Sequence, residues 1–127
     1  MMGTLAAKGG KAVGKAGENE ACLFLLGMGH RILERNYRDS HLEIDIISED
    51  VRGLHFVVVK SRTAPVAAAP EESVNAAKRK RIASAASAYL KRHPGASEVF
   101  FDIVTVEFDG GKTSVGWFPE AWIPIFC

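Results

Sequence analysis

The chain has 127 residues, of which 47% are hydrophobic and 24% charged, and its formal net charge is +1. This composition is typical of one globular domain and excludes a disordered chain, while the small net charge excludes a protein that is basic overall. Nucleic-acid binding would therefore need local clusters of basic residues. The two cysteines, Cys22 and Cys127, form neither a disulfide framework nor a metal knuckle, and no apolar run is long enough to cross a bilayer. We expect a cytoplasmic protein without a membrane partner.

The first half of the chain predicts one helix and three strands. Residues 1–10 are small and glycine-rich and are expected to fray, which leaves residues 11–127 as a single domain. Apolar residues spaced by three or four predict a helix from about Lys11 to Gly29. Patterns of alternating residues predict strands over 31–38, 41–48 and 54–60. The third strand, "LHFVVVK", is rich in β-branched residues, as is typical of a strand buried on both faces.

The second half predicts a helix followed by a hairpin. An Ala/Pro-rich loop over 61–70 precedes a long helix from about Glu71 to Arg92, which "HPG" ends. Two further strands, over 97–108 and 112–118, flank the turn "DGG". The order α-β-β-β-α-β-β, without a repeat or linker, predicts an α/β fold with a mixed central sheet of about five strands flanked by helices.

Two segments partly match the sequence motif of phosphate-binding loops. "GGKAVGKA" fits G-x-x-x-x-G-K, but Ala16 stands where a Ser or Thr must hold magnesium, and no apolar strand precedes it. "GKT" at 111–113 has Val106 in place of the first glycine and lies in a predicted hairpin. Neither segment predicts a nucleotide site.

A candidate site lies on the second and third predicted strands. Since alternate strand residues share a face, Val58 and Lys60 point the same way, and so do Glu43 and Asp45. The short turn between the strands makes them neighbours, so Asp45 can approach Lys60. A carboxylate there can hold magnesium, and the ammonium group can stabilise charge that develops on a phosphate.

The two helices supply further candidates. Glu18 on the first helix is a third carboxylate, and Lys78 on the second falls on its apolar stripe. Phosphate contacts around the rim would come from four arginines: Arg35, Arg38, Arg62 and Arg81. Each of these charged residues also has an ordinary interpretation, as a solvent-facing strand residue, an edge lysine or a solvated helix face.

Four segments together resemble one family: "GENEACLFLLGMGHRILERNYRDSHLEIDII", "FVVVKSR", "VNAAKRKRIASAASAYL" and "FFDIVTV". Over residues 14–108 the chain is similar to the YraN-type family of uncharacterised bacterial proteins. That family belongs to the PD-(D/E)xK nuclease superfamily and is related in fold to archaeal Holliday-junction resolvases. The resemblance implies a restriction-endonuclease-like core.

The resemblance also implies roles for single residues. Glu18, Glu43 and Asp45 match acids of the family pattern, and Lys60 and Lys78 match its lysines. In this superfamily the Asp and a strand Glu hold Mg²⁺ or Mn²⁺, with help from the main-chain carbonyl that follows the Glu, here that of Val59.

The chain departs from the family pattern at two positions. Val58 stands where the family has that Glu, and Leu42 where it has a glycine. A valine cannot coordinate a metal, so Glu18 and Glu43 would have to compensate.

Three functions remain open. The first is a magnesium-dependent, structure-specific endonuclease acting on branched DNA. The second is a catalytically inactive nuclease fold that binds DNA or a protein partner through its cations. The third is a structural dimer formed by an edge strand or by the C-terminal "WFPEAWIPIF". The resolvase-like resemblance also implies a homodimer.

Overall fold

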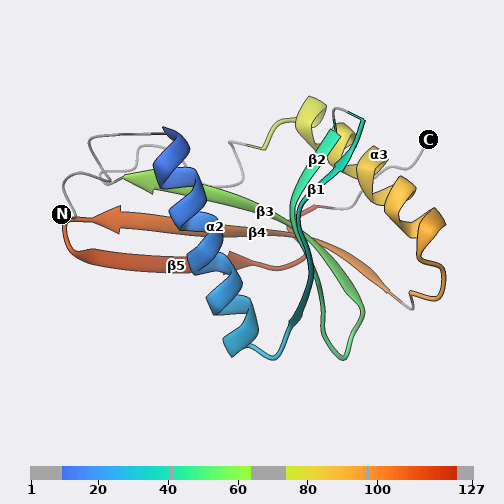
Figure 1. The fold of residues 1–127 in the computed structure, drawn as a ribbon, viewed down its shortest axis with the longest axis horizontal. Helices are drawn as coiled ribbons and strands as arrows, with labels where there is room; N and C mark the ends of the chain where they lie inside the picture. Colours follow the sequence, from blue (N-terminus) through green and yellow to red (C-terminus); the bar gives the residue numbers. More distant parts are fainter. Residues whose placement is uncertain (1–9, 41, 64–73, 97, 123–127) are drawn as a thin grey trace.

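The computed structural model describes residues 10–40, 42–63, 74–96 and 98–122. In this part of the chain five strands form one sheet in the order β1-β2-β3-β4-β5, with two helices packed against it (Figure 1). The elements are α2 (Gly10–Gly27), β1 (Arg31–Asp39), β2 (Leu42–Glu49), β3 (Leu54–Thr63), α3 (Ala76–Arg92), β4 (Val99–Asp109) and β5 (Lys112–Phe118). Within the described ranges, neither helix combines the length and apolar character needed to cross a bilayer.

The sheet is mixed, as its element order predicts. β3 pairs parallel with β4, and α3 makes the crossover between them, whereas the other neighbouring strands pair antiparallel. The predicted α/β fold, with a mixed five-stranded sheet and flanking helices, is confirmed, and it agrees with a restriction-endonuclease-like core.

Each face of the sheet carries its own apolar cluster. The cluster under α3 contains Phe56 and Val58 of β3, and the cluster under α2 contains Val57. β3 is therefore buried on both faces, as its run of β-branched residues predicts. Other members under α3 include Ile44, Ile47, Ile82, Ala85, Tyr89, Phe101 and Ile103, and under α2 Val13, Ala21, Cys22, Leu25, Ile46, Val104 and Val106.

The expected alternation along β2 is wrong at one point. Ile44 and Ile47 join the cluster under α3, whereas Ile46 joins the cluster under α2, so the two-residue period breaks between Ile44 and Ile46. Asn36 of the neighbouring β1 has a φ of 52°, a left-handed conformation that Asn tolerates better than most residues. The break places Ile44 on the same face as Ile47, so two isoleucines of β2 join the cluster under α3 and one joins the cluster under α2.

Two element ends differ from those predicted by more than two residues. α3 begins at Ala76 rather than Glu71, because the Asn75 side chain accepts a hydrogen bond from the Lys78 N–H and caps the helix there. β3 continues to Thr63 instead of ending at Lys60, because residues 61–63 extend the parallel ladder with β4.

Several predictions fall outside the described residues. They concern the fraying of residues 1–9, the loop over 64–70, the start of the helix over 71–73 and the C-terminal residues 123–127.

Candidate functional site

Asp45 lies where the ladder between β2 and β3 ends. The last pair of that ladder joins Ile46 to Val57, and beyond it Asp45 Oδ2 accepts a hydrogen bond of 2.8 Å from the Val59 N–H. Burial raises the pKa of the Asp45 carboxyl, while the Val59 N–H and the charge of Lys78 oppose that rise. The carboxylate is therefore fixed against β3, one residue before Lys60.

Lys60 is half-buried near two other cations. Burial lowers the pKa of its ammonium group, the charges of Lys78 and Arg62 lower it further, and the charge of Asp45 raises it. Lys78 comes from α3 and Arg62 from β3 itself. Lys60 thus interacts electrostatically with Lys78, Arg62 and Asp45, and Asp45 with Lys78 and with the acids Glu18 and Glu43.

Gly17 determines how closely α2 approaches this end of β3. A Cβ atom at Gly17 would lie 1.7 Å from the Ser61 Oγ, so only glycine fits at this contact. The next residue, Glu18, is half-buried, and its charge raises the pKa of Asp45. The contact with glycine thereby positions a second acid near the first.

Two of the predicted phosphate-binding arginines contact acids of the protein. Arg35 Nη2 lies 3.8 Å from Glu18 Oε1 and also donates to Asn19 Oδ1 at 2.8 Å. Arg38 Nε lies 3.6 Å from Glu43 Oε2, and both side chains are exposed.

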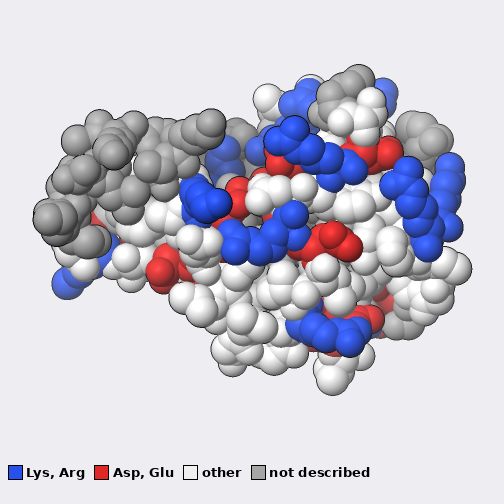
Figure 2. Space-filling view, in the orientation of Figure 1, with Lys and Arg blue, Asp and Glu red and all other residues white. Residues whose placement is uncertain are grey.

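Basic and acidic side chains also lie side by side at the surface. Figure 2 shows Lys and Arg beside Asp and Glu over the centre of this face, between α2 and the β1–β2 hairpin. Among the remaining predicted arginines, Arg81 is exposed on α3 and Arg62 is half-buried.

The predicted magnesium ligands do not lie close enough together to hold an ion as they stand. Across the described ranges, one group of three His, Cys, Asp or Glu side chains lies close enough to hold an ion, and it does not include Glu18, Glu43 or Asp45. Val58 is 2% exposed, packs under α3 and offers no ligand. Since Mg²⁺ needs near-octahedral oxygen coordination, these residues as they stand do not fit a magnesium site. The roles of Glu18, Glu43 and the Val59 carbonyl as metal ligands stay predictions.

Sequence reasoning missed the three side chains that do lie close enough together to hold an ion. They are those of His30, Asp50 and His55, and Asp102 of β4 lies beside them. Residues so far apart in the chain form no local motif. The one available signal was His55 inside the apolar strand "LHFVVVK", because a buried histidine needs hydrogen-bonding partners.

Residues 17–106 match the model of the uncharacterised protein family UPF0102. The chain belongs to this family. Similar relatives, each named UPF0102 protein, come from Anaeromyxobacter dehalogenans (38% identical, covering 90% of this chain and 86% of the relative), Bacteroides thetaiotaomicron (40%, covering 88% and 93%) and Symbiobacterium thermophilum (44%, covering 76% and 83%). UPF0102 is a PD-(D/E)xK nuclease-like family, so the resemblance noted from the sequence is confirmed.

Proposed function

We propose that this protein binds the phosphate backbone of nucleic acid around Lys60 and does not cut it. One observation carries the proposal: the half-buried Lys60 feels the charges of Lys78 and Arg62 as well as that of Asp45, whose carboxylate the Val59 N–H holds against the same strand. Such a local surplus of cations attracts phosphate even though the net charge of the chain is only +1. Partial burial of Lys60 strengthens the attraction, because the local dielectric is lower than in water.

The absence of cutting is inferred from the acids. Val58 supplies no oxygen ligand, and both Glu18 and Glu43 have an arginine within ion-pair distance. Magnesium binding would therefore depend on Asp45 and main-chain oxygens, which is a poor ligand set for a hard divalent ion.

The second candidate is magnesium-dependent cleavage of branched DNA. It is favoured by the position of Asp45, which is hydrogen-bonded to β3 one residue before Lys60. An Asp beside a strand lysine is part of the superfamily pattern. The two candidates share one binding surface and differ in the presence of a competent metal site.

Binding is tested by fluorescence anisotropy with a labelled four-way junction, a flap, a plain duplex and a single strand, over a series of salt concentrations. Lys60→Ala and Lys78→Ala should each weaken binding about tenfold and reduce the log–log salt slope by about one unit, because each removes a phosphate contact. RNA versions of the same probes identify the preferred nucleic acid.

Lys91→Ala and Lys112→Ala are the matched controls. Both lysines are exposed, on the last turn of α3 and at the start of β5, and both substitutions remove the same charge. Equal losses of affinity in all four variants would show that binding depends on overall charge and would contradict the proposed surface.

A further inference from the structure

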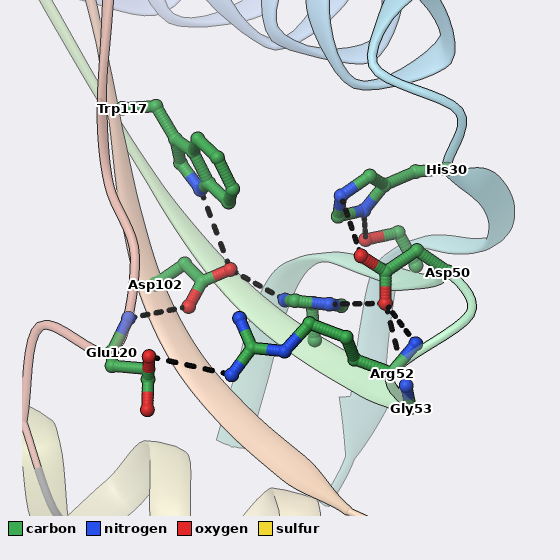
Figure 3. A network of polar contacts seen from close by, with 9 residues as sticks. His30, Asp50, Arg52, Gly53, Asp102, Trp117 and Glu120 are labelled. Carbon is green, nitrogen blue, oxygen red and sulfur yellow. Dashed lines mark hydrogen bonds and ion pairs between the residues drawn. The ribbon is translucent and has the colours of Figure 1, made fainter.

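The group of His30, Asp50 and His55 lies at the opposite end of β3 from Lys60. His30 follows α2, Asp50 lies in the turn between β2 and β3, and His55 is the second residue of β3. Their ligand atoms all lie within 4.8 Å of one another. Figure 3 shows His30 and Asp50 directed toward each other, with Asp102 on the other side of the network.

The spacing of the ligand atoms suits a small tetrahedral ion. Nε2 of His55 lies 2.9 Å from Oδ1 of Asp50, and Nε2 of His30 lies 3.6 Å from Oδ2. Bonds of about 2.0 Å in tetrahedral geometry place neighbouring donor atoms roughly 3.3 Å apart. Both distances are close to that value but are measured to different oxygens of Asp50, so an ion held by one oxygen requires a small shift of one ring. The 3.6 Å contact is too long for a hydrogen bond, whereas at His55 the ion replaces the proton that Nε2 donates to Asp50 Oδ1.

The other nitrogen of each ring is already held. Nδ1 of His55 lies 2.7 Å from Oδ2 of Asp102, and because a carboxylate only accepts, this nitrogen carries a proton. Nδ1 of His30 lies 3.0 Å from Oγ of Ser48. Metal-binding histidines commonly use one nitrogen in this way, and it leaves Nε2 facing the ion.

Asp102 is itself held in place. The N–H of Glu120 donates to its Oδ1 at 2.9 Å, and Trp117 Nε1 donates to its Oδ2 at 3.4 Å. The His55 ring is therefore oriented by a residue with its own fixed partners, as in a carboxylate–histidine–metal arrangement.

Asp50 is oriented by the turn that contains it. Its Oδ1 accepts hydrogen bonds from the N–H groups of Arg52, at 3.0 Å, and Gly53, at 3.3 Å, which leaves Oδ2 directed at His30. The Asp50 side chain is 18% exposed, whereas those of His30 and His55 are 1% exposed. An ion would therefore reach the site from the side of the cluster on which Asp50 lies.

The charges of the surrounding groups also favour a cation. Two carboxylates, Asp50 and Asp102, contact the His55 ring, so one imidazolium offsets only one of their charges. A divalent ion with two neutral histidines would offset both.

We propose that His30, Asp50 and His55 bind a divalent transition-metal ion of the zinc type, with a fourth position open to water. Two imidazole nitrogens and one carboxylate suit Zn²⁺ or Co²⁺ and do not suit Mg²⁺. The ion joins the end of α2, the β2–β3 turn and β3, so it stabilises the fold. His55 precedes Lys60 by five positions in β3, or about 16 Å at about 3.3 Å per residue, so this site is separate from the proposed phosphate-binding surface.

Thermal unfolding of the metal-stripped full chain tests the proposal. Free Zn²⁺ at 100 times its Kd should raise Tm by roughly 10 °C, while the same concentration of Mg²⁺ should leave Tm unchanged. Asp50→Asn and His30→Gln should abolish the Zn²⁺ shift. His93→Gln, which changes an exposed histidine at the end of α3, and Asp45→Asn, which changes the other end of β3, should retain it.

A second readout does not depend on stability. The four-coordinate Co²⁺ form should show visible absorption bands in the full chain and lose them in Asp50→Asn. This substitution keeps the size of a partly exposed side chain, so it remains informative where a buried histidine variant does not fold.

Three results would overturn the proposal. The first is no Tm shift and no visible bands in the full chain, which would make the cluster a hydrogen-bonded network only. The second is a shift and bands unaltered in Asp50→Asn. The third is the loss of the Tm shift and of the visible bands in Cys22→Ser, which would place the ion on the buried thiol instead.

Discussion

The two ends of β3 bury polar groups in different ways. At the beginning of the strand, His55 lies between the carboxylates of Asp50 and Asp102, at 2.9 and 2.7 Å, and opposite charges meet. Farther along, the like charges of Lys78 and Arg62 act on Lys60, and the charge of Asp45 opposes them. The strand between them, including Phe56 and Val58, is buried and apolar.

This difference separates a region that supports folding from the region to which we assign nucleic-acid binding. Buried polar groups whose hydrogen bonds are made within the protein stabilise the native state. A half-buried lysine beside other cations destabilises it until an anion arrives, and such perturbed groups concentrate at functional sites. Substitutions at the two ends should therefore change stability in opposite directions.

The largest effect is expected at the His55 end. His55→Ala leaves the buried Asp102 carboxylate without its imidazole partner, which should lower the free energy of unfolding by about 3–5 kcal/mol. Urea unfolding in a chelator-containing buffer measures this loss without any metal contribution. His93→Ala, at an exposed position, should lose no more than about 1 kcal/mol. Similar small losses in both variants would contradict the stabilising role of the network.

A smaller effect is expected where α2 meets the far part of β3. In Gly17→Ala the new methyl group collides with Ser61, which should cost about 1–3 kcal/mol of unfolding free energy. Ser61→Gly in the same chain should restore part of that loss, as a double-mutant cycle would measure. Gly14→Ala is the control, because nothing lies within 4 Å of its added Cβ and alanine favours the helix. A loss in Gly14→Ala equal to that in Gly17→Ala would refute the close contact.

The smallest effect, of opposite sign, is expected at Asp45. Burial raises its pKa, so the folded state holds a proton more tightly than the unfolded state, and stability falls as pH rises from the unfolded to the folded pKa. Asp45→Asn removes this penalty while keeping an acceptor for the Val59 N–H, so it should raise stability at pH 7 by on the order of 1 kcal/mol. The gain should shrink as pH falls from the raised pKa of folded Asp45 toward the ordinary Asp pKa, and should be absent below the latter. Unfolding curves across pH test this, and a destabilised Asp45→Asn would contradict it.

The local features of this architecture could be predicted from the sequence. A run of β-branched residues predicts that β3 is buried on both faces, and a short turn predicts that β2 and β3 are neighbours. From those two features the approach of Asp45 to Lys60 follows. The inward position of Lys78 follows from helical spacing alone.

What the sequence did not predict depends on contacts between distant residues. The break in β2 between Ile44 and Ile46 puts Ile44 in the cluster under α3, which the two-residue period of the sequence does not predict. The pairing of Arg35 with Glu18 joins β1 to α2, so these residues could be predicted as charged but not as partners. The contact between His55 and Asp102 spans 47 positions and requires the parallel β3–β4 pairing to exist first.

Cleavage assays test the central claim, binding without cutting, most directly. A labelled four-way junction, a flap and a duplex are incubated with Mg²⁺ or Mn²⁺ and four proteins: the chain, Asp45→Ala, Val58→Glu, and Val58→Glu with Asp45→Ala. Circular dichroism confirms that each variant is folded, since Val58 is buried. The account predicts no cutting by the chain, and metal-dependent cutting by Val58→Glu that disappears when Asp45 is also replaced. Cutting by the unaltered chain that is lost in Asp45→Ala would contradict it.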